Sequence, residues 1–205
     1  MALGTATTPY ELRFDAGRIC LDLLSTTHPA EQLGSVPPLR AWITGTGLVP
    51  PGTPLGHLDA SWPAAFRELR GHVRRLVLAG LPSGGRLREA GPTAADDLAL
   101  AGVNDLARTA PPAPRAVRCE DGLLLRAPDG PPECAALLAA VARDAVELLT
   151  DPVARAALRQ CAGDNCPIVY LDTSRGRRRR WCSSELCGNR ERVARHRRRA
   201  ALARA

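Results

Sequence analysis

The chain has 205 residues with a net charge of +7, and its 45% hydrophobic and 24% charged residues are typical of one globular domain plus a small module. Residues 1–5 lack the basic start of a secretory signal, and no apolar run approaches the roughly 20 residues of a membrane helix, so we expect an intracellular protein outside the membrane. The absence of lysine excludes a Schiff-base lysine and a P-loop.

The first half of the chain predicts one short strand and then helices. Residues 10–14 alternate between apolar and polar side chains, as a half-buried strand does. The apolar run at residues 19–24 predicts a buried helix, and residues 39–43 predict a second, short helix. Ser61 and Pro63 are start signals for a longer helix, whose apolar residues recur with helical spacing up to Gly80.

The second half predicts more helix and one hairpin. Thr93 with Asp96 resembles a capping box for a helix that continues through Leu98, Val103 and Leu106. Residues 115–126 predict a hairpin, and residues 134–149 have the clearest helical periodicity in the chain. We therefore expect an α+β fold: a helix-dominated domain with a small β-sheet in residues 1–150, and a separate module in residues 151–205.

Four of the seven cysteines lie close together near the end of the chain. Cys161 and Cys166 are separated by four residues, and after a gap of 15 residues Cys182 and Cys187 repeat this spacing. Two cysteine pairs around a hairpin-length segment are typical of a tetrahedral Zn²⁺ site. We expect a strand at residues 167–171, a turn at 172–176, a return strand at 177–181, and a helix after Cys187, which together form a treble-clef-like zinc finger.

Two other interpretations of these cysteines fit less well. Two disulfides would use the same four residues, but they are rare inside cells. A catalytic zinc site keeps an open coordination position, whereas four thiolates close the shell. The remaining residues, Cys20, Cys119 and Cys134, lie in apolar runs and are expected to be buried core thiols.

The C-terminal segment resembles a known family. Residues 170–174, 179–183 and 187–190 are similar to the CGNR zinc finger, which is named for the tetrapeptide Cys187-Gly188-Asn189-Arg190. In that family the finger follows an ABATE domain, whose proposed role is stress-induced transcription regulation and whose signature resembles residues 20–26. The family usually has asparagine at the position of Ser25. The resemblance implies a bacterial DNA-binding regulator.

Positive charge is concentrated near the finger. Residues 1–154 carry a net charge of −3, with 14 arginines and 17 acidic residues, whereas residues 155–205 carry +10, with 14 arginines and four acidic residues. A basic end on a near-neutral body is typical of nucleic-acid binding. The expected contact residues lie on the hairpin and the terminal helix: Arg177, Arg178, Arg179, Arg180, Arg190, Arg192, Arg195, His196, Arg198 and Arg199. Asn189 or Arg190 could instead be buried in support of the finger.

The N-terminal body contains no G-x-S-x-G, G-x-G-x-x-G or H-E-x-x-H motif, so we do not expect an enzyme. Asp22, Ser25 and His28 fall near one helical face and form a candidate ligand site. A buried, hydrogen-bonded structural carboxylate is an equally good interpretation of Asp22.

These observations predict a zinc-dependent, stress-responsive transcription regulator that binds double-stranded DNA in the cytoplasm, at the nucleoid. Duplex DNA is favoured over single strands because Tyr170 and Trp181 are expected to pack inside the finger and not to stack on bases. A small-molecule effector and a homodimer are further expectations. The alternatives are an RNA-binding zinc module, an enzyme with its site near Asp22 and His28, and a redox switch based on oxidation of the zinc thiolates.

Overall fold

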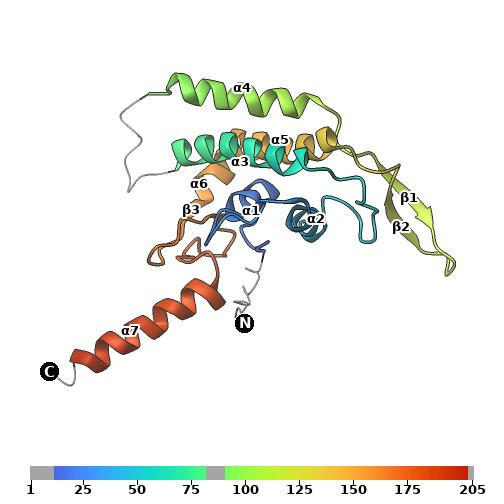
Figure 1. Cartoon of the computed structure of the whole chain (residues 1–205). Coiled ribbons are helices and arrows are strands. Elements are labelled where there is room, and N and C mark those ends of the chain that lie inside the picture. Colours follow the sequence, from blue (N-terminus) through green and yellow to red (C-terminus); the bar gives the residue numbers. More distant parts are fainter. Residues whose placement is uncertain (1–11, 82–90, 203–205) are drawn as a thin grey trace, which may run out of the picture.

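The computed structural model describes residues 12–81 and 91–202 (Figure 1). Its elements in chain order are α1 (Ile19–Ser25), α2 (Val36–Gly45), α3 (Ser61–Gly80), α4 (Ala94–Arg108), β1 (Pro114–Arg118), β2 (Leu124–Pro128), α5 (Cys134–Thr150), α6 (Pro152–Ala157), β3 (Leu158–Gln160), β4 (Val169–Leu171), the π-helix η1 (Ser184–Gly188) and α7 (Asn189–Leu202). The expected helices are present, and the helix-dominated α+β fold class is confirmed.

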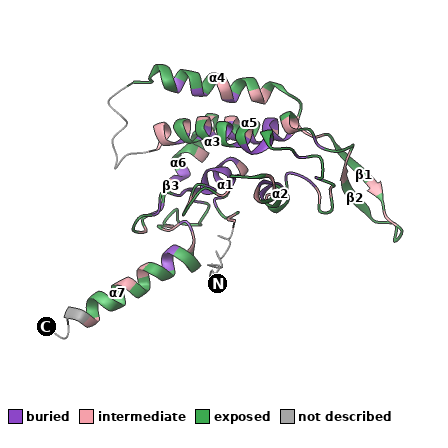
Figure 2. Ribbon diagram, viewed as in Figure 1, coloured by how far each residue is buried: buried purple, intermediate pink, exposed green. Residues whose placement is uncertain are grey.

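Helices α3 and α5 lie side by side in one layer, α4 packs on the outer side of this layer, and α1 and α2 form a second layer on its other side (Figure 1). The apolar positions of α3 and α5 that recur with helical spacing are the buried ones, and Phe66 of α3 meets Trp42 of α2 edge to face with ring centroids 5.8 Å apart. Figure 2 shows that buried residues gather on α1 and on the facing sides of the long helices. The core of the body therefore lies between these two layers.

Helix α1 is buried along almost its whole length, from Cys20 to Ser25. The first turn of a helix leaves backbone N–H groups without a partner in the helix. In α1 one of these, the N–H of Cys20, donates to the Asp144 carboxylate of α5 at 2.9 Å. The same carboxylate forms an ion pair of 2.7 Å with Arg18. Helix α1 is thereby fixed to α5 at its N-terminus.

Helix α4 begins with the predicted capping box. The Thr93 hydroxyl accepts from the backbone N–H of Asp96, and the Asp96 carboxylate accepts from the backbone N–H of Thr93. The helix continues through Leu98, Val103 and Leu106 as expected; the side chain of Val103 is buried, whereas that of Leu98 is 69% exposed. Helix α4 lies on the outer side of α3 and α5, and only one side of it has a partner among the described elements (Figure 1).

The predicted hairpin is confirmed, with β1 and β2 antiparallel and Val117 opposite Leu125. It projects from the helical body (Figure 1), and most of its side chains are exposed. Cys119, after β1, and Cys134, at the start of α5, are only half-buried, so the expectation of three core thiols holds for Cys20 alone. Cys119 lies at the turn of the hairpin, and Cys134 packs at the edge of the core.

The strands of the C-terminal module, after α6, differ from those predicted. Strand β4 is present, but it pairs with β3, which precedes the first cysteine, and residues 177–181 do not form a return strand. The turn before them is present, since the N–H of Arg177 donates to the carbonyl of Ser174 at 3.0 Å. The strand expected at residues 10–14 is absent at residues 12–14, and its first two residues lie outside the described part.

No helix within residues 12–81 and 91–202 has the length and apolar character needed to cross a bilayer.

Candidate metal centre and basic surface

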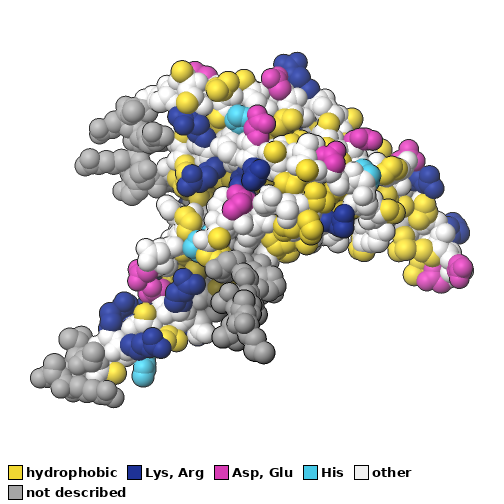
Figure 3. Space-filling model, viewed as in Figure 1, with side chains coloured by type: hydrophobic (Ala, Val, Ile, Leu, Met, Phe, Trp, Pro, Cys, Tyr) yellow, Lys and Arg dark blue, Asp and Glu magenta, His cyan; other side chains and the backbone are white. Residues whose placement is uncertain are grey.

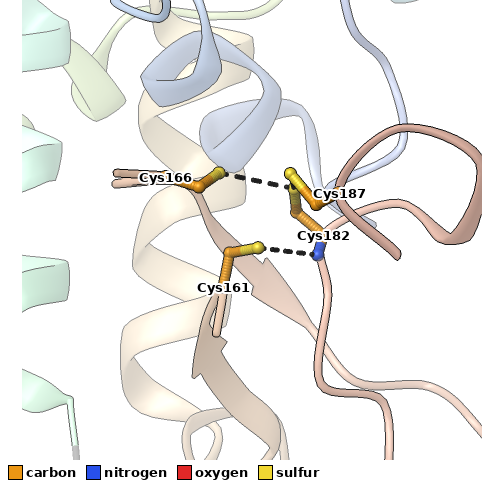
Figure 4. Close-up of side chains that lie close together, drawn as sticks. All are labelled: Cys161, Cys166, Cys182 and Cys187. Atoms are coloured by element: carbon orange, nitrogen blue, oxygen red, sulfur yellow. Dashed lines mark hydrogen bonds between the residues drawn. The ribbon is translucent and has the colours of Figure 1, made fainter. Parts of the chain in front are cut away.

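The four predicted cysteines come together from three segments (Figure 4). Cys161 follows β3, Cys166 precedes β4, Cys182 lies in the loop after β4, and Cys187 lies in η1. All four are buried, and their sulfur atoms lie within 4.8 Å of one another. The Sγ atoms of Cys166 and Cys182 are 3.7 Å apart, and those of Cys182 and Cys187 are 3.5 Å apart.

These distances suit one tetrahedral metal ion. A Zn–S bond of about 2.3 Å places the sulfur atoms of a regular tetrahedron about 3.8 Å apart, close to the observed separations. Four soft sulfur donors are the ligand set that Zn²⁺ prefers in closed structural sites. The residues present therefore fit a metal ion, which would be held by four thiolates with no open position.

The backbone around the first pair forms a tight knuckle. The N–H of Cys161 donates to the carbonyl of Ile168 at 2.9 Å, and the N–H of Cys166 donates to Gly163 at 3.1 Å. A side chain at Gly163 would place its Cβ 3.4 Å from the Sγ of Cys161 and from the Cβ of Cys187. These are van der Waals distances, so Gly163 lies directly against the cysteine cluster.

Hydrogen bonds reach the sulfur atoms from three donors. The N–H groups of Cys182 and Gly163 point at the Sγ of Cys161, at 3.3 and 3.4 Å, and the Nη1 of Arg13 donates to the Sγ of Cys182 at 3.2 Å. Donors of this kind stabilise negative charge on sulfur and orient the ligand.

The thiols differ in acidity according to these contacts. Although burial opposes it, hydrogen bonds from the backbone lower the pKa of Cys161. Burial raises the pKa of Cys166 to about 11 and raises that of Cys187 as well. Thiols with such pKa values keep their protons at neutral pH, so a bound cation is needed to hold them as thiolates.

The contact from Arg13 is one that the sequence did not reveal. Arg13 and Cys182 are 169 positions apart, and the same guanidinium forms an ion pair of 2.7 Å with Asp15. We call residues 13–17 the strap. Its carbonyl at Ala16 accepts from the N–H of Leu171 in β4 at 2.8 Å, so the strap joins the finger to the residues just before α1.

Arg179 was expected to contact nucleic acid, and the structure gives it a different position. Its guanidinium lies over the Tyr170 ring, 4.5 Å from the centroid, and its Nε donates to the carbonyl of Trp181 at 2.9 Å. It also donates to the carbonyls of Cys182 and Asp15. Arg179 is therefore engaged within the finger and in its contact with the strap, and a contact with nucleic acid through it stays a prediction.

Asp172 holds the turn before Arg179 through hydrogen bonds. Its buried carboxylate accepts from the N–H and hydroxyl of Ser174 and from the N–H of Arg179. Although burial would raise it, these hydrogen bonds lower the pKa of Asp172. The carboxylate fixes the turn that leads to the second cysteine pair.

The other predicted basic residues are solvent-exposed, including Arg190, for which burial was an alternative. Figure 3 shows arginine side chains spaced along α7. The exposed set consists of Arg177, Arg178, Arg180, Arg190, Arg192, Arg195, His196, Arg198 and Arg199. Asn189 is also exposed, so the expectation that one of these two neighbours is buried in the finger is wrong.

The structure does not give the candidate ligand residues of the N-terminal body one common contact. Asp22 is buried and accepts from the N–H of Ala16 at 3.0 Å, and the hydroxyl of Ser25 donates to the carbonyl of Leu21 at 3.2 Å. His28 lines a shallow hollow beside the knuckle, with Cys161 and Cys166. Burial, with the charges of Arg190 and Arg13, lowers the pKa of His28. A ligand site on these residues stays a prediction.

A helical body joined to a cationic four-cysteine module defines a two-part protein with a C-terminal metal-binding finger. In comparison with family profiles, residues 17–152 match ABATE, described as "Putative stress-induced transcription regulator", and residues 157–200 match the CGNR zinc finger. The chain belongs to the ABATE family and carries a CGNR zinc finger, as the sequence resemblance predicted. None of the curated proteins compared with the chain matches it.

Proposed function

We propose that this protein is a zinc-dependent transcription regulator that binds double-stranded DNA through its C-terminal finger. The observation that carries the proposal is the exposed helix α7, which begins two residues after the last cysteine and has no buried residue between positions 189 and 200. Residues 155–205 have a net charge of +10. Cations on a helix held by a metal site can contact phosphates and enter the major groove.

Zinc is the metal that the donor set favours. Four buried sulfur atoms suit Zn²⁺. Structural zinc contributes about 10–16 kcal/mol in small fingers. When bound, the ion supplies a rigid cross-link between the knuckle, the loop after β4 and η1.

The family description supports a biological setting for this regulator. A stress-responsive regulator would act in the cytoplasm at the nucleoid, and the ABATE body would receive the signal, through a small-molecule effector or through a homodimer contact. The family is one of regulators, which favours a protein that is not an enzyme.

The test is a salt titration of zinc-loaded protein on duplex DNA. If about five phosphates are neutralised, log K should fall with log salt with a slope near −4.5. Cys182→Ser removes one metal ligand and should abolish this binding, whereas Cys119→Ser, outside the metal site, should leave it intact. A slope near zero, or equal binding by both variants, would contradict the proposal.

RNA binding is the second candidate, and the exposed arginines favour it as much as they favour DNA. The same titration on total RNA separates the two. The expected burial is confirmed for Tyr170, whereas Trp181 is only partly buried. Tyr170 therefore offers no stacking surface for unpaired bases, which supports duplex DNA as the first choice.

A further inference from the structure

Helix α7 has an unusual position for a helix of 14 residues. Its main contact with the described chain is η1 at its own start, and from there it extends away from the body (Figure 1). Arginines with the same charge at neighbouring turns repel one another, and an isolated helix of this length is only marginally stable in water. A polyanion along the helix would remove that repulsion.

The exposed residues of α7 fall into two stripes. Arg192, Arg195, His196 and Arg199 have the spacing i, i+3, i+4, i+7, and we call them the basic stripe. Arg190, Val193, Ala194 and Arg197 have the same spacing two residues earlier, and we call them the groove stripe. An offset of two residues is a rotation of about 200°, so the stripes lie on opposite sides of the helix.

The two stripes differ in chemistry. The groove stripe lines a shallow groove of about 390 Å³ with Leu186 and Glu185 of η1, and the side chains of Leu186 and Val193 are 53% and 44% exposed there. Apolar side chains and a carboxylate on this side are poorly suited to a phosphate surface. All four residues of the basic stripe carry nitrogen donors and none is acidic.

The remaining charges of the helix lie between the stripes. Arg198 forms an ion pair of 3.8 Å with Glu191, so its charge is partly compensated. The uncompensated cations of α7 therefore separate into those on the basic stripe and the two that flank the apolar groove.

We propose that the basic stripe is the face of α7 that lies against duplex DNA, in the major groove, and that the groove stripe points away from it. This inference rests on the proposed DNA binding and assigns the surface and the residues that perform it. The major groove, about 12 Å wide, admits one helix, with arginine able to reach guanine edges and phosphates.

The test compares two double variants of the zinc-loaded full chain on a mixed-sequence duplex. Arg195→Ala/Arg199→Ala removes two charges from the basic stripe, and Arg190→Ala/Arg197→Ala removes two from the groove stripe of the same helix. We expect the first variant to lose at least tenfold in affinity and to lower the salt slope by about 1.8, while the second changes affinity less than threefold. Helicity and zinc content should match in both.

A second measurement uses the wild-type protein. Chemical modification of exposed arginines, followed by mass spectrometry, should show Arg195 and Arg199 protected by the duplex, and Arg190 and Arg197 still reactive.

The outcomes separate the two proposals. Salt-sensitive duplex binding with equal losses in both variants, or equal protection of all four arginines, overturns the assignment of the face and leaves DNA binding in place. Absence of salt-sensitive duplex binding by the wild type overturns the proposed function itself. Preference for RNA in the same assay would mean that the partner is RNA and not duplex DNA.

Discussion

Arg13 connects two parts of the chain that are far apart in sequence. Its side chain is 12% exposed, and it donates to the Sγ of Cys182 while pairing with Asp15. A guanidinium stays charged at any pH that the protein meets, so it stabilises a thiolate permanently. The surroundings of the four cysteines therefore include a hydrogen-bond donor from the N-terminal body.

Arg13→Ala should weaken zinc binding. Loss of a hydrogen bond to a metal ligand typically costs 10- to 100-fold in metal affinity, and we expect a loss in this range. Competition with a chromogenic chelator measures it. Arg40→Ala, an exposed arginine of α2, is the matched control and should bind zinc as the wild type does. Equal zinc affinity of the two variants would show that the contact between Arg13 and Cys182 does not contribute to metal binding.

Asp22 should make stability depend on pH. Burial, together with the charges of Asp15 and Asp144, raises the pKa of its carboxyl to about 7, although the N–H of Ala16 and the charge of Arg13 oppose this. The folded-state value lies above the unfolded value of about 3.9, so the folded state binds more protons between these pH values. The contribution of Asp22 to stability is therefore full below about pH 4 and is lost as the pH rises through 7.

Asp22→Asn removes this dependence, and its amide oxygen can still accept from Ala16. The difference in free energy of unfolding between wild type and variant should shift in favour of the variant from pH 5.5 to pH 8. Denaturant titrations of both proteins at both pH values measure it, and the subtraction removes the effect of pH on the metal site. An unchanged difference would show that Asp22 is charged throughout.

At the level of elements, periodicity predicted the long helices well because each buries one side. The apolar residues of α5 and the capping box of α4 are local signals, and the structure contains both. Strand β3 is only three residues long and pairs across the knuckle, so it leaves no local signal. The return strand was predicted from its place after a turn. In the structure these residues bond to other groups: the N–H of Arg179 donates to Asp172, and the Arg179 side chain donates to the carbonyl of Trp181.

In the candidate site, too, local patterns were predictable from the sequence and contacts between distant segments were not. The spacing of four cysteines predicted the metal cluster, because ligand geometry requires pairs of this kind. The contact of Arg13 with Cys182 and the contact of the strap with Leu171 depend on how the finger packs on the body. Composition also could not separate Arg179, over Tyr170, from the exposed arginines beside it.

Gly17 lies where the strap meets β4, and Gly17→Ala tests this packing. Its φ is +91°, a conformation that alanine avoids, and an added Cβ would lie 3.2 Å from the Cβ of Leu171. We expect a loss of more than about 1 kcal/mol in unfolding free energy. Gly34→Ala is the control, since nothing lies within 4 Å of the added atom there. Equal denaturant midpoints for both variants would contradict the proposed contact.

At the level of the whole molecule, body and finger share one core. Tyr170, Ile168 and Val169 belong to the same cluster of buried residues as Leu21 and Leu23 of α1. The division at residue 150 stays a prediction, because buried side chains continue across it. A metal ion in the finger would then also stabilise α1, and a signal received by the body could reach α7 through the strap.

Removal of zinc should therefore affect both parts of the chain. We expect chelation to speed amide hydrogen exchange at residues 158–190 and also at residues 16–25, because the N–H of Leu171 and the carbonyl of Ala16 lose their fixed geometry together. Exchange in α4, which lies on the far side of α3 and α5, should change least and serves as the internal control (Figure 1). Faster exchange confined to residues 158–202 would mean that the finger unfolds alone, and the strap would then carry no coupling between metal and body.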